Sequence, residues 1–342
     1  MKNKNIFYFL NLKLTILLAI YIFVLLSSLN MFSLASNAET EMIVATFHPR
    51  SGTADVESLF YFKELVEKTS NGKIKVNVFY GGTLGGQQEL IDQVRLGTIH
   101  LSIASATTYD SYVPNISPWG VPYLFSDKEE FMKTWTGNIG DRVNEIMEEK
   151  GLIFGGIIFR GNRQLTSNKI VKVPEDLKGL KLRLPELEGW VVVWKALGAI
   201  PVPIPSPEVF SSLQMGVVDA QENPNSSNYS KRLWEVQKYT ILTNHIIDWQ
   251  TFLLSKKFLD SLEDEDRKII MDSISKTVVW YNDFSEKQEQ ELVEEMKEEG
   301  MEFITIDTEL FKEVALSTMD WFKSSWEPWV YQEVMDIVSK KE

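Results

Sequence analysis

The sequence predicts an α/β protein, in which short strands alternate with amphipathic helices. Apolar runs such as MIVATF, KIKVNVFY and IHLSIAS alternate with the helical stretches ADVESLFYFKELVEKT and QQELIDQVRLG. This order is typical of repeated strand-helix units around a parallel sheet. The chain has 342 residues, which is long enough to bury the core of one large domain or of two.

The continuation of this pattern indicates a second sheet. Further strands are predicted at GLIFGGIIF, GLKLRLP, AIPVPI and VVDAQE, with helices over residues 191–197 and 207–215. We expect the first sheet near residues 39–160 and the second near residues 161–248. The run HIIDWQTFLLS then returns the chain to the first sheet.

The C-terminal part is mainly helical. From residue 263 to residue 299, apolar side chains recur at helical spacing with no stop signal before Gly300, which predicts one or two long helices. MEFITI follows as a short strand, and Asp307 is a suitable N-cap for a last helix. We expect Pro328 to kink or interrupt that last helix, because proline lacks a backbone N–H.

The first 38 residues have the layout of a secretory signal. A basic stretch, MKNKNIFYFLNLK, precedes the uncharged apolar run LTILLAIYIFVLLSSL, and the small residues Ser36, Asn37 and Ala38 follow. We expect cleavage after Ala38 and a periplasmic protein. The alternative is an uncleaved membrane anchor, since the apolar run approaches the length of a spanning helix.

The strong negative charge limits the classes of partner. The formal net charge is -13, and removal of Lys2, Lys4 and Lys13 with the leader gives -13 - 3 = -16. Such a surface argues against nucleic acid as a partner. It would not attract an anion from a distance, so an anion site must be a local arginine inside a cleft. The chain has no cysteine, which removes disulfides, thiolate nucleophiles and a lipid anchor on a thiol. We expect a monomer.

The motifs that would mark a catalytic or cofactor site are missing. The cluster GGTLGG at residues 81–86 has the spacing of neither a dinucleotide fingerprint nor a phosphate loop, so we interpret it as a tight turn. His48, His100 and His245 are too far apart in sequence to form a paired metal site. We therefore expect a non-catalytic protein with no cofactor and no metal. The alternative is an exported lyase or hydrolase that uses paired carboxylates.

Three polar residues stand at the edges of short apolar strands, where the loops of an open sheet form a ligand crevice. They are Arg163, Arg183 and Asn223. An arginine at such a place offers a planar fork that matches a carboxylate with two parallel hydrogen bonds. The alternative is that each arginine pairs with a neighbouring acid such as Glu175 or Glu186.

Several segments resemble the solute-binding subunits of tripartite ATP-independent periplasmic (TRAP) transporters, of the dicarboxylate- or sialic-acid-binding type. They are GKIKVNVFYGGTLGG, NRQLTSNK, VPEDLKGLKLRLP, KALGAIPVPIPSPEVFSSLQMGVVDAQENP and EVQKYTILTNH. The resemblance implies a two-domain periplasmic-binding-protein fold, with two mixed sheets flanked by helices, a hinge cleft and a long connecting helix. It also implies a small carboxylate ligand and a membrane permease as partners. An exported sensor or scaffold of the same fold is the alternative.

The resemblance also suggests how the chain divides and which residues hold the ligand. Residues 39–160 with 249–288 would form domain I, and residues 161–248 with 289–342 would form domain II. The family's arginine in Leu-Arg-Val-Pro corresponds to LRLP here and implies that Arg183 clamps the ligand carboxylate. The arginine before Gln-x-Thr-Ser-Asn implies a second contact from Arg163, and the asparagine of Gln-Glu-Asn-Pro implies one from Asn223.

The remaining candidates concern specificity. Asn162 departs from the aromatic residue of many relatives, and Glu186 and Trp190 follow the clamp on a loop that commonly faces the pocket. Glu186 would accept hydrogen bonds from hydroxyls or an amine and disfavour a second carboxylate, or it would neutralise Arg163. Trp190 would stack on a ligand or pack within its helix. Candidates for the opposite wall are Phe47, His48, Ser105, Tyr109 and Trp249.

Overall fold

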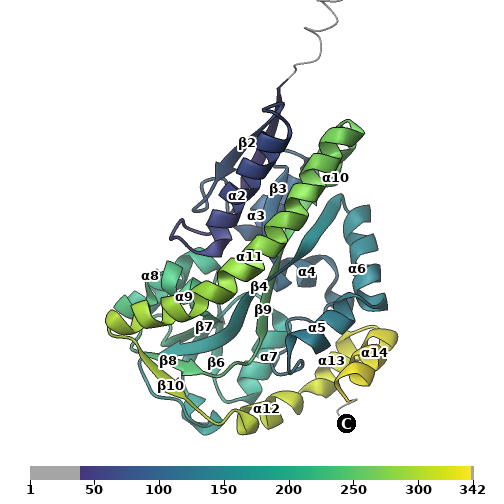
Figure 1. Cartoon of the computed structure of the whole chain (residues 1–342). Helices are drawn as coiled ribbons and strands as arrows, with labels where there is room; N and C mark the ends of the chain where they lie inside the picture. Colours follow the sequence, from purple (N-terminus) through teal and green to yellow (C-terminus); the bar gives the residue numbers. More distant parts are fainter. Residues whose placement is uncertain (1–38, 340–342) are drawn as a thin grey trace, which may run out of the picture.

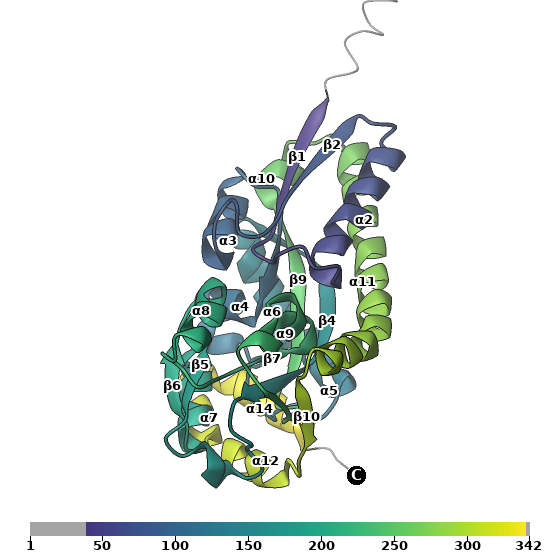
Figure 2. The same cartoon turned by 90° about the vertical axis from the view of Figure 1, so that its left-hand side faces the viewer.

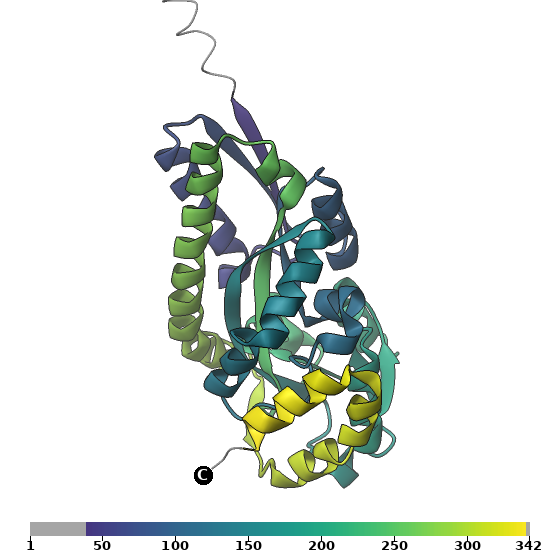
Figure 3. The same cartoon turned by 90° about the vertical axis from the view of Figure 1, so that its right-hand side faces the viewer.

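The computed structural model describes residues 39–339, so the predicted leader and its cleavage point lie outside the described residues. Figure 1 shows an elongated molecule in which helices flank a central sheet, and Figures 2 and 3 show helices on both faces of that sheet. The predicted α/β class, with mixed sheets flanked by helices, is confirmed. Within the described residues, no helix combines the length and the apolar character needed to cross a membrane.

The strands follow the spatial order β2-β1-β3-β9-β4-β7-β5-β6, and β8 pairs with both β4 and β10. Their bounds are β1 (Thr40–Ala45), β2 (Ile74–Phe79), β3 (Leu101–Ser105), β4 (Leu152–Ser167), β5 (Lys181–Leu184), β6 (Ile200–Pro203), β7 (Ala220–Pro224), β8 (Tyr239–Leu242), β9 (Ile247–Ser255) and β10 (Glu302–Thr305).

The sheet is mixed because the two long strands, β4 and β9, pair antiparallel with each other and with their other neighbours. The pairs β1–β2, β1–β3, β5–β6 and β5–β7 are parallel, as the strand-helix alternation predicts. In contrast, β9 is antiparallel to β3 and to β4. The first part of β4 pairs with β9, and its last residues pair with β7 and β8. One strand therefore belongs to both sheets, and it runs through residue 160, where the sequence places the domain boundary. The division into two domains stays a prediction.

Helices cover both faces of the sheet and its ends. Their bounds are α2 (Ala54–Thr69), α3 (Gln87–Leu96), α4 (Ala106–Tyr112), α5 (Lys128–Trp135), α6 (Asn138–Glu149), α7 (Glu188–Ala196), α8 (Val209–Gln214), α9 (Asn225–Ser230), α10 (Lys256–Asp260), α11 (Asp264–Glu298), α12 (Glu309–Leu316), α13 (Met319–Ser325) and α14 (Pro328–Val338). The helices predicted at residues 191–197 and 207–215 correspond to α7 and α8.

The predicted C-terminal helices are also present. Helix α11 is one continuous helix of 35 residues. It contacts α2, β4 and α9, so it lies along the molecule as Figure 1 shows. The last helical region is broken into short helices, and Pro328 is the first residue of α14. Asp307 accepts a hydrogen bond from the N–H of Glu309 at the start of α12, at 3.0 Å. Helix α12 contacts α7, and helix α14 contacts α5. The C-terminal helices therefore pack against two helices from the middle of the chain.

Two register shifts interrupt the pairing of β4 with β9, one between residues 154 and 157 and one between residues 159 and 162. At the first shift, Gly156 adopts φ +113°, which side-chain-bearing residues rarely adopt. A Cβ atom at Gly156 would lie 2.8 Å from Cγ2 of Val278 on α11. Asn282 of α11 fills the gap in the ladder, since its side chain accepts from Phe159 N–H and donates to the Ile157 carbonyl. The shift thus lets β4 and α11 approach closely.

We expect Gly156→Ala to lower the free energy of unfolding by about 1–3 kcal/mol, because it adds backbone strain and a clash with Val278. Urea unfolding followed by circular dichroism would measure the change. Gly179 is a matched control, since it has φ +81° and nothing within 4 Å of an added Cβ atom. An equal loss in Gly179→Ala would contradict a role for the contact with Val278.

Candidate functional site

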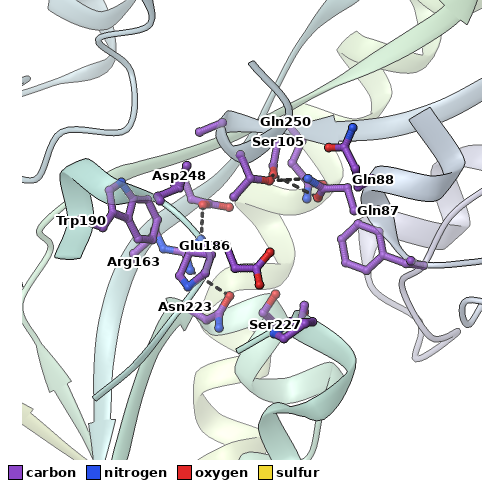
Figure 4. A pocket seen from close by; sticks show the side chains of 18 of the residues that line it. Gln87, Gln88, Ser105, Arg163, Glu186, Trp190, Asn223, Ser227, Asp248 and Gln250 are labelled. Carbon is purple, nitrogen blue, oxygen red and sulfur yellow. Dashed lines mark hydrogen bonds and ion pairs between the residues drawn. The ribbon is translucent and has the colours of Figure 1, made fainter. Parts of the chain in front are cut away.

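A cleft of about 590 Å³ lies where β1, β3, β5 and β7 end. Ligands of open α/β sheets bind at this edge, outside the carboxyl ends of the strands. Figure 4 shows the labelled side chains converging from both sides of the cleft. The cleft brings together most of the residues that the sequence predicts, namely Arg163, Arg183, Asn223, Glu186, Trp190, Phe47, His48, Ser105 and Trp249.

Two predicted site residues, Tyr109 and Asn162, do not line this cleft. Tyr109 is fully buried and packs against Trp135 and Trp249, with ring centroids 5.6 and 5.1 Å away. The Tyr109 ring therefore lies in the hydrophobic core. Asn162 is exposed and lies next to Arg163 on β4, and successive strand residues point to opposite faces. Because Arg163 faces the cleft, Asn162 faces away from it.

Arg183 is a buried cation that has no acid partner. It is the third residue of β5 and is only 2% exposed. Its Nε donates to the Ile204 carbonyl at 2.8 Å, which fixes the plane of the guanidinium. No ion pair to Arg183 exists among residues 39–339, so neither Glu175 nor Glu186 neutralises it. Burial lowers the pKa of Arg183 to about 10; the charges of Glu222 and Glu186 raise it, and the Arg163 cation lowers it. The group stays protonated near neutral pH, and no carboxylate of residues 39–339 lies within ion-pair distance of it.

Lys231, which follows α9, is a second cation without an ion pair in the described chain. Burial lowers its pKa to about 8, and the positive charges of Arg183 and Arg160 lower it further. No sequence pattern singles out this lysine. It does not line the cleft, but its charge adds to the positive charge around Arg183, although the whole chain is strongly acidic.

Arg163, in contrast, already has its hydrogen-bonding partners within the protein. Its Nε donates to Glu222 Oε2 at 2.5 Å and its NH1 donates to Asp248 Oδ1 at 2.6 Å. Its NH2 donates to Glu222 and to Asn223 Oδ1 at 3.0 Å. The Trp190 ring lies over the guanidinium, with its centroid 4.8 Å from Cζ. Arg163 therefore holds Glu222, Asp248 and Asn223 in place, and Glu186 is not its partner.

A residue that the sequence analysis missed, Arg160, extends this network. Its NH2 donates to Asp55 Oδ2 and to Ser227 Oγ, both at 2.8 Å, and its NH1 donates to Asp248 Oδ2 at 3.2 Å. Arg160 and Arg163 are three apart, so strict alternation would place them on opposite faces. The register shift between residues 159 and 162 turns both toward the same carboxylate.

Two buried histidines flank the network as neutral groups. Burial lowers the pKa of His48 to about 3, despite the nearby Asp55 carboxylate, and its Nε2 lies 3.1 Å from Gln250 Nε2. Burial also lowers the pKa of His245, whose Nε2 contacts Glu222 Oε2 at 2.9 Å. Neither histidine carries charge near neutral pH. Among residues 39–339, no group of three or more acidic or histidine side chains is arranged to hold a metal ion.

The wall opposite Arg163 carries neutral polar side chains. Gln87 at the start of α3 accepts from Ser105 Oγ at 3.0 Å and donates to Thr108 at 3.1 Å. Gln88 is exposed and also lines the cleft. Figure 4 shows these glutamines across the cleft from Arg163, with Glu186 between the two sides. Such groups suit hydroxyls, because each can donate or accept. Neither glutamine is predictable from the sequence, since amides on a helix surface carry no distinctive pattern.

The site therefore combines one uncompensated guanidinium, neutral hydrogen-bonding groups and a stacked tryptophan. Trp190 is 4% exposed and lines the cleft, so it both packs within α7 and contributes to the wall. The exposed Glu186 contributes a negative charge to the rim. This arrangement can bind a carboxylate and several hydroxyls.

The chain is similar in sequence and in fold to known solute-binding proteins. The model of the family described as bacterial extracellular solute-binding protein, family 7, matches residues 45–324. The 2,3-diketo-L-gulonate-binding periplasmic protein of Escherichia coli K12 is 32% identical over 254 residues, covering 74% of this chain and 77% of the relative.

Solved structures of TRAP periplasmic solute-binding proteins have the same fold. One from Polaromonas sp. JS666, bound to D-erythronate, has a TM-score of 0.81 and 28% identity, covering 89% of this chain and 100% of the other. One from Shewanella oneidensis, with bound succinate, has a TM-score of 0.82 and 25% identity, covering 88% and 100%. The first ligand is a hydroxylated monoacid and the second is a diacid, so these neighbours do not by themselves select a ligand class.

Proposed function

The chain belongs to bacterial extracellular solute-binding protein family 7, and on that premise we propose that it captures a polyhydroxylated monocarboxylate at Arg183 for delivery to a membrane permease. It is a TRAP-type solute-binding protein, so its task is to bind a small organic acid. We further propose that the mature protein is periplasmic, is released from its leader by cleavage after Ala38, and is not an enzyme.

The observation that carries this proposal is the buried, unpaired guanidinium of Arg183. Burying a charge without a partner is costly, and a ligand carboxylate would supply the missing counter-ion. The guanidinium can meet that carboxylate with two parallel hydrogen bonds. Asn223 supports the same role, because it lines the cleft and is held in place by a hydrogen bond of 3.0 Å from Arg163. Arg163 thus serves to position Asn223 and Trp190.

A monoacid is favoured over a diacid by the other charges around the cleft. The lining includes Glu89, Glu186 and Glu208 at its rim. These carboxylates would repel a second carboxylate on the ligand, whereas they accept hydrogen bonds from hydroxyls. Gln87, Gln88 and the other amides of the lining offer donors and acceptors for the same hydroxyls. We therefore expect tighter binding of an aldonate than of a dicarboxylate of equal length.

Calorimetric titration with D-erythronate and with succinate tests the proposal, because both are four-carbon acids. We expect D-erythronate to bind more tightly, and Glu186→Gln to strengthen succinate binding by about fivefold, through loss of a like charge. Glu188→Gln is the matched control, since Glu188 does not line the cleft. Tighter binding of succinate by the unmodified protein would overturn the ligand class. If D-erythronate, succinate and longer aldonates all fail to bind, the proposed function is wrong.

A further inference from the structure

A second cavity, of about 470 Å³, lies beside the carboxylate cleft. It is bounded by α4, by the residues that follow α4, by the start of α7, and by α13. Ser111, Glu186, Leu187 and Trp190 line both the cleft and this cavity. The two spaces therefore share a wall that consists of Ser111 of α4, the loop before α7 and the first turn of α7.

The charge of this second cavity is negative. Its lining contains the acids Asp110, Glu186 and Glu188 and no lysine, arginine or histidine. The net charge of the chain is also strongly negative. A cavity lined by one sign of charge concentrates ions of the opposite sign. The occupant that fits this lining is a cation.

Aromatic rings form the apolar part of the lining. Trp321 and Phe322 of α13 are perpendicular, with centroids 4.9 Å apart and an interplanar angle of 87°. Trp326 follows, with its ring 5.2 Å from that of Phe322. Aromatic rings that lie at different angles around one space can place their negative π faces around a cation. Recognition of ammonium groups by aromatic side chains works in this way.

Three polar atoms of the lining form no hydrogen bond of ordinary geometry and are shielded from solvent, namely Asp110 Oδ1, Ser117 Oγ and Trp190 Nε1. Ser117 is 5% exposed and Trp190 is 4% exposed. Burial raises the pKa of Asp110 to about 7, and its contact with the Ser117 hydroxyl offsets this only in part. Because Asp110 and Ser117 contact each other, Trp190 Nε1 is the atom that lacks a partner. Buried polar groups in folded proteins nearly always have partners, so Trp190 indicates a ligand that is polar as well as cationic.

We propose that the second cavity binds a small organic ammonium ion, paired with Asp110 and enclosed by Trp321, Phe322 and Trp326. A hydroxyl on that ion would satisfy Trp190. The site needs no bound carboxylate. A further consequence rests on the proposed function: because Glu186 lines both spaces, a bound cation offsets its charge and favours the neighbouring carboxylate.

Calorimetric titration with choline, without any carboxylate ligand, tests the site. The matched probe is 3,3-dimethyl-1-butanol, which has the shape of choline but no charge. At constant ionic strength, we expect choline to bind at least about tenfold more tightly than the neutral alcohol. No binding at millimolar choline, or equal binding of the two probes, would overturn the proposal.

Two variants separate this site from unspecific attraction to an acidic protein. We expect Asp110→Asn and Trp321→Leu each to weaken choline binding by about fivefold or more. Glu149→Gln makes the same charge change at an exposed position outside both cavities, and should leave choline binding unchanged. If Asp110→Asn does not fold, the half-buried Trp321 still provides the test. Equal effects of all three variants would overturn the site.

The coupling is measured by titrating D-erythronate with and without saturating choline. We expect choline to tighten erythronate binding by about fivefold, and erythronate to tighten choline binding equally, since coupling is reciprocal. Choline binding with no effect on erythronate would overturn the shared role of Glu186. Choline binding in a protein that binds no carboxylate would overturn the proposed function and leave the ammonium site supported.

Discussion

Replacing Arg183 with alanine is expected to weaken binding of a carboxylate ligand by about 2–5 kcal/mol, because the ligand charge would then be buried without a partner. Arg183 is buried and held in plane by the Ile204 carbonyl, yet no carboxylate of the described chain pairs with it. Its charge-assisted contact would therefore be made only with the ligand. Calorimetry with D-erythronate, or with any acid that the unmodified protein binds, measures this change in binding free energy.

The stability of the unliganded variant distinguishes a ligand-binding arginine from a structural one. Arg183→Ala removes an unpaired buried cation, so we expect the free protein to unfold at an unchanged or higher urea concentration. Arg183→Lys keeps the charge but loses the planar fork, so its affinity should lie between those of the other two proteins. Unchanged affinity in Arg183→Ala would exclude the clamp. A large loss of stability in the free variant would instead indicate a structural role.

The sequence makes Arg183 a candidate because a single short segment, LRLP, resembles the clamp segment of the family. The residue lies one position before the end of a short strand that a proline follows, within LRLP, and that local pattern survives in the structure as β5. The long helix α11 and the interruption at Pro328 are predictable for the same reason, since helical spacing and the missing proline N–H are local properties.

The partners of the other arginines are not predictable in this way. Arg160 faces the cleft because of a register shift in β4, and no residue pattern announces a shift of one position. Asp248, which pairs with both Arg160 and Arg163, lies 88 and 85 residues away in the sequence. The sequence leaves open that Glu186 neutralises Arg163, whereas Glu222 and Asp248 do so. Ion pairs between distant segments depend on strand pairing, which the sequence of either segment alone does not encode.

Two predicted residues of the opposite wall, Ser105 and Tyr109, also differ in how well the sequence predicts their surroundings. Ser105 lies at a strand end, and the structure keeps it in the cleft beside Gln87. Tyr109 lies one turn later on α4 and is buried. Side chains a few residues apart on a helix face different directions, so one can line the cleft while another lies in the core. Sequence periodicity assigns the helix, but it does not say which of two buried surroundings the ring enters.

Replacing Asp248 with asparagine is expected to lower the free energy of unfolding by about 3–5 kcal/mol, because two buried guanidiniums would lose a shared counter-ion. Asp248 is 6% exposed, with Oδ1 2.6 Å from Arg163 and Oδ2 3.2 Å from Arg160. It lies on β9, and both arginines lie on β4, so the pairs join the two crossing strands. Urea unfolding of the unliganded protein measures the loss.

Asp272→Asn is the matched control for this prediction. Asp272 pairs with Lys268 at 2.6 Å on α11, but the two side chains are 55% and 75% exposed. Such exposed pairs contribute about 0–1 kcal/mol, so the two variants differ only in burial and in the number of partners. Equal losses would contradict the structural role of Asp248. A double variant with Arg163→Met should lose less than the sum of the single variants, because the second change removes the cation that the first leaves unpaired.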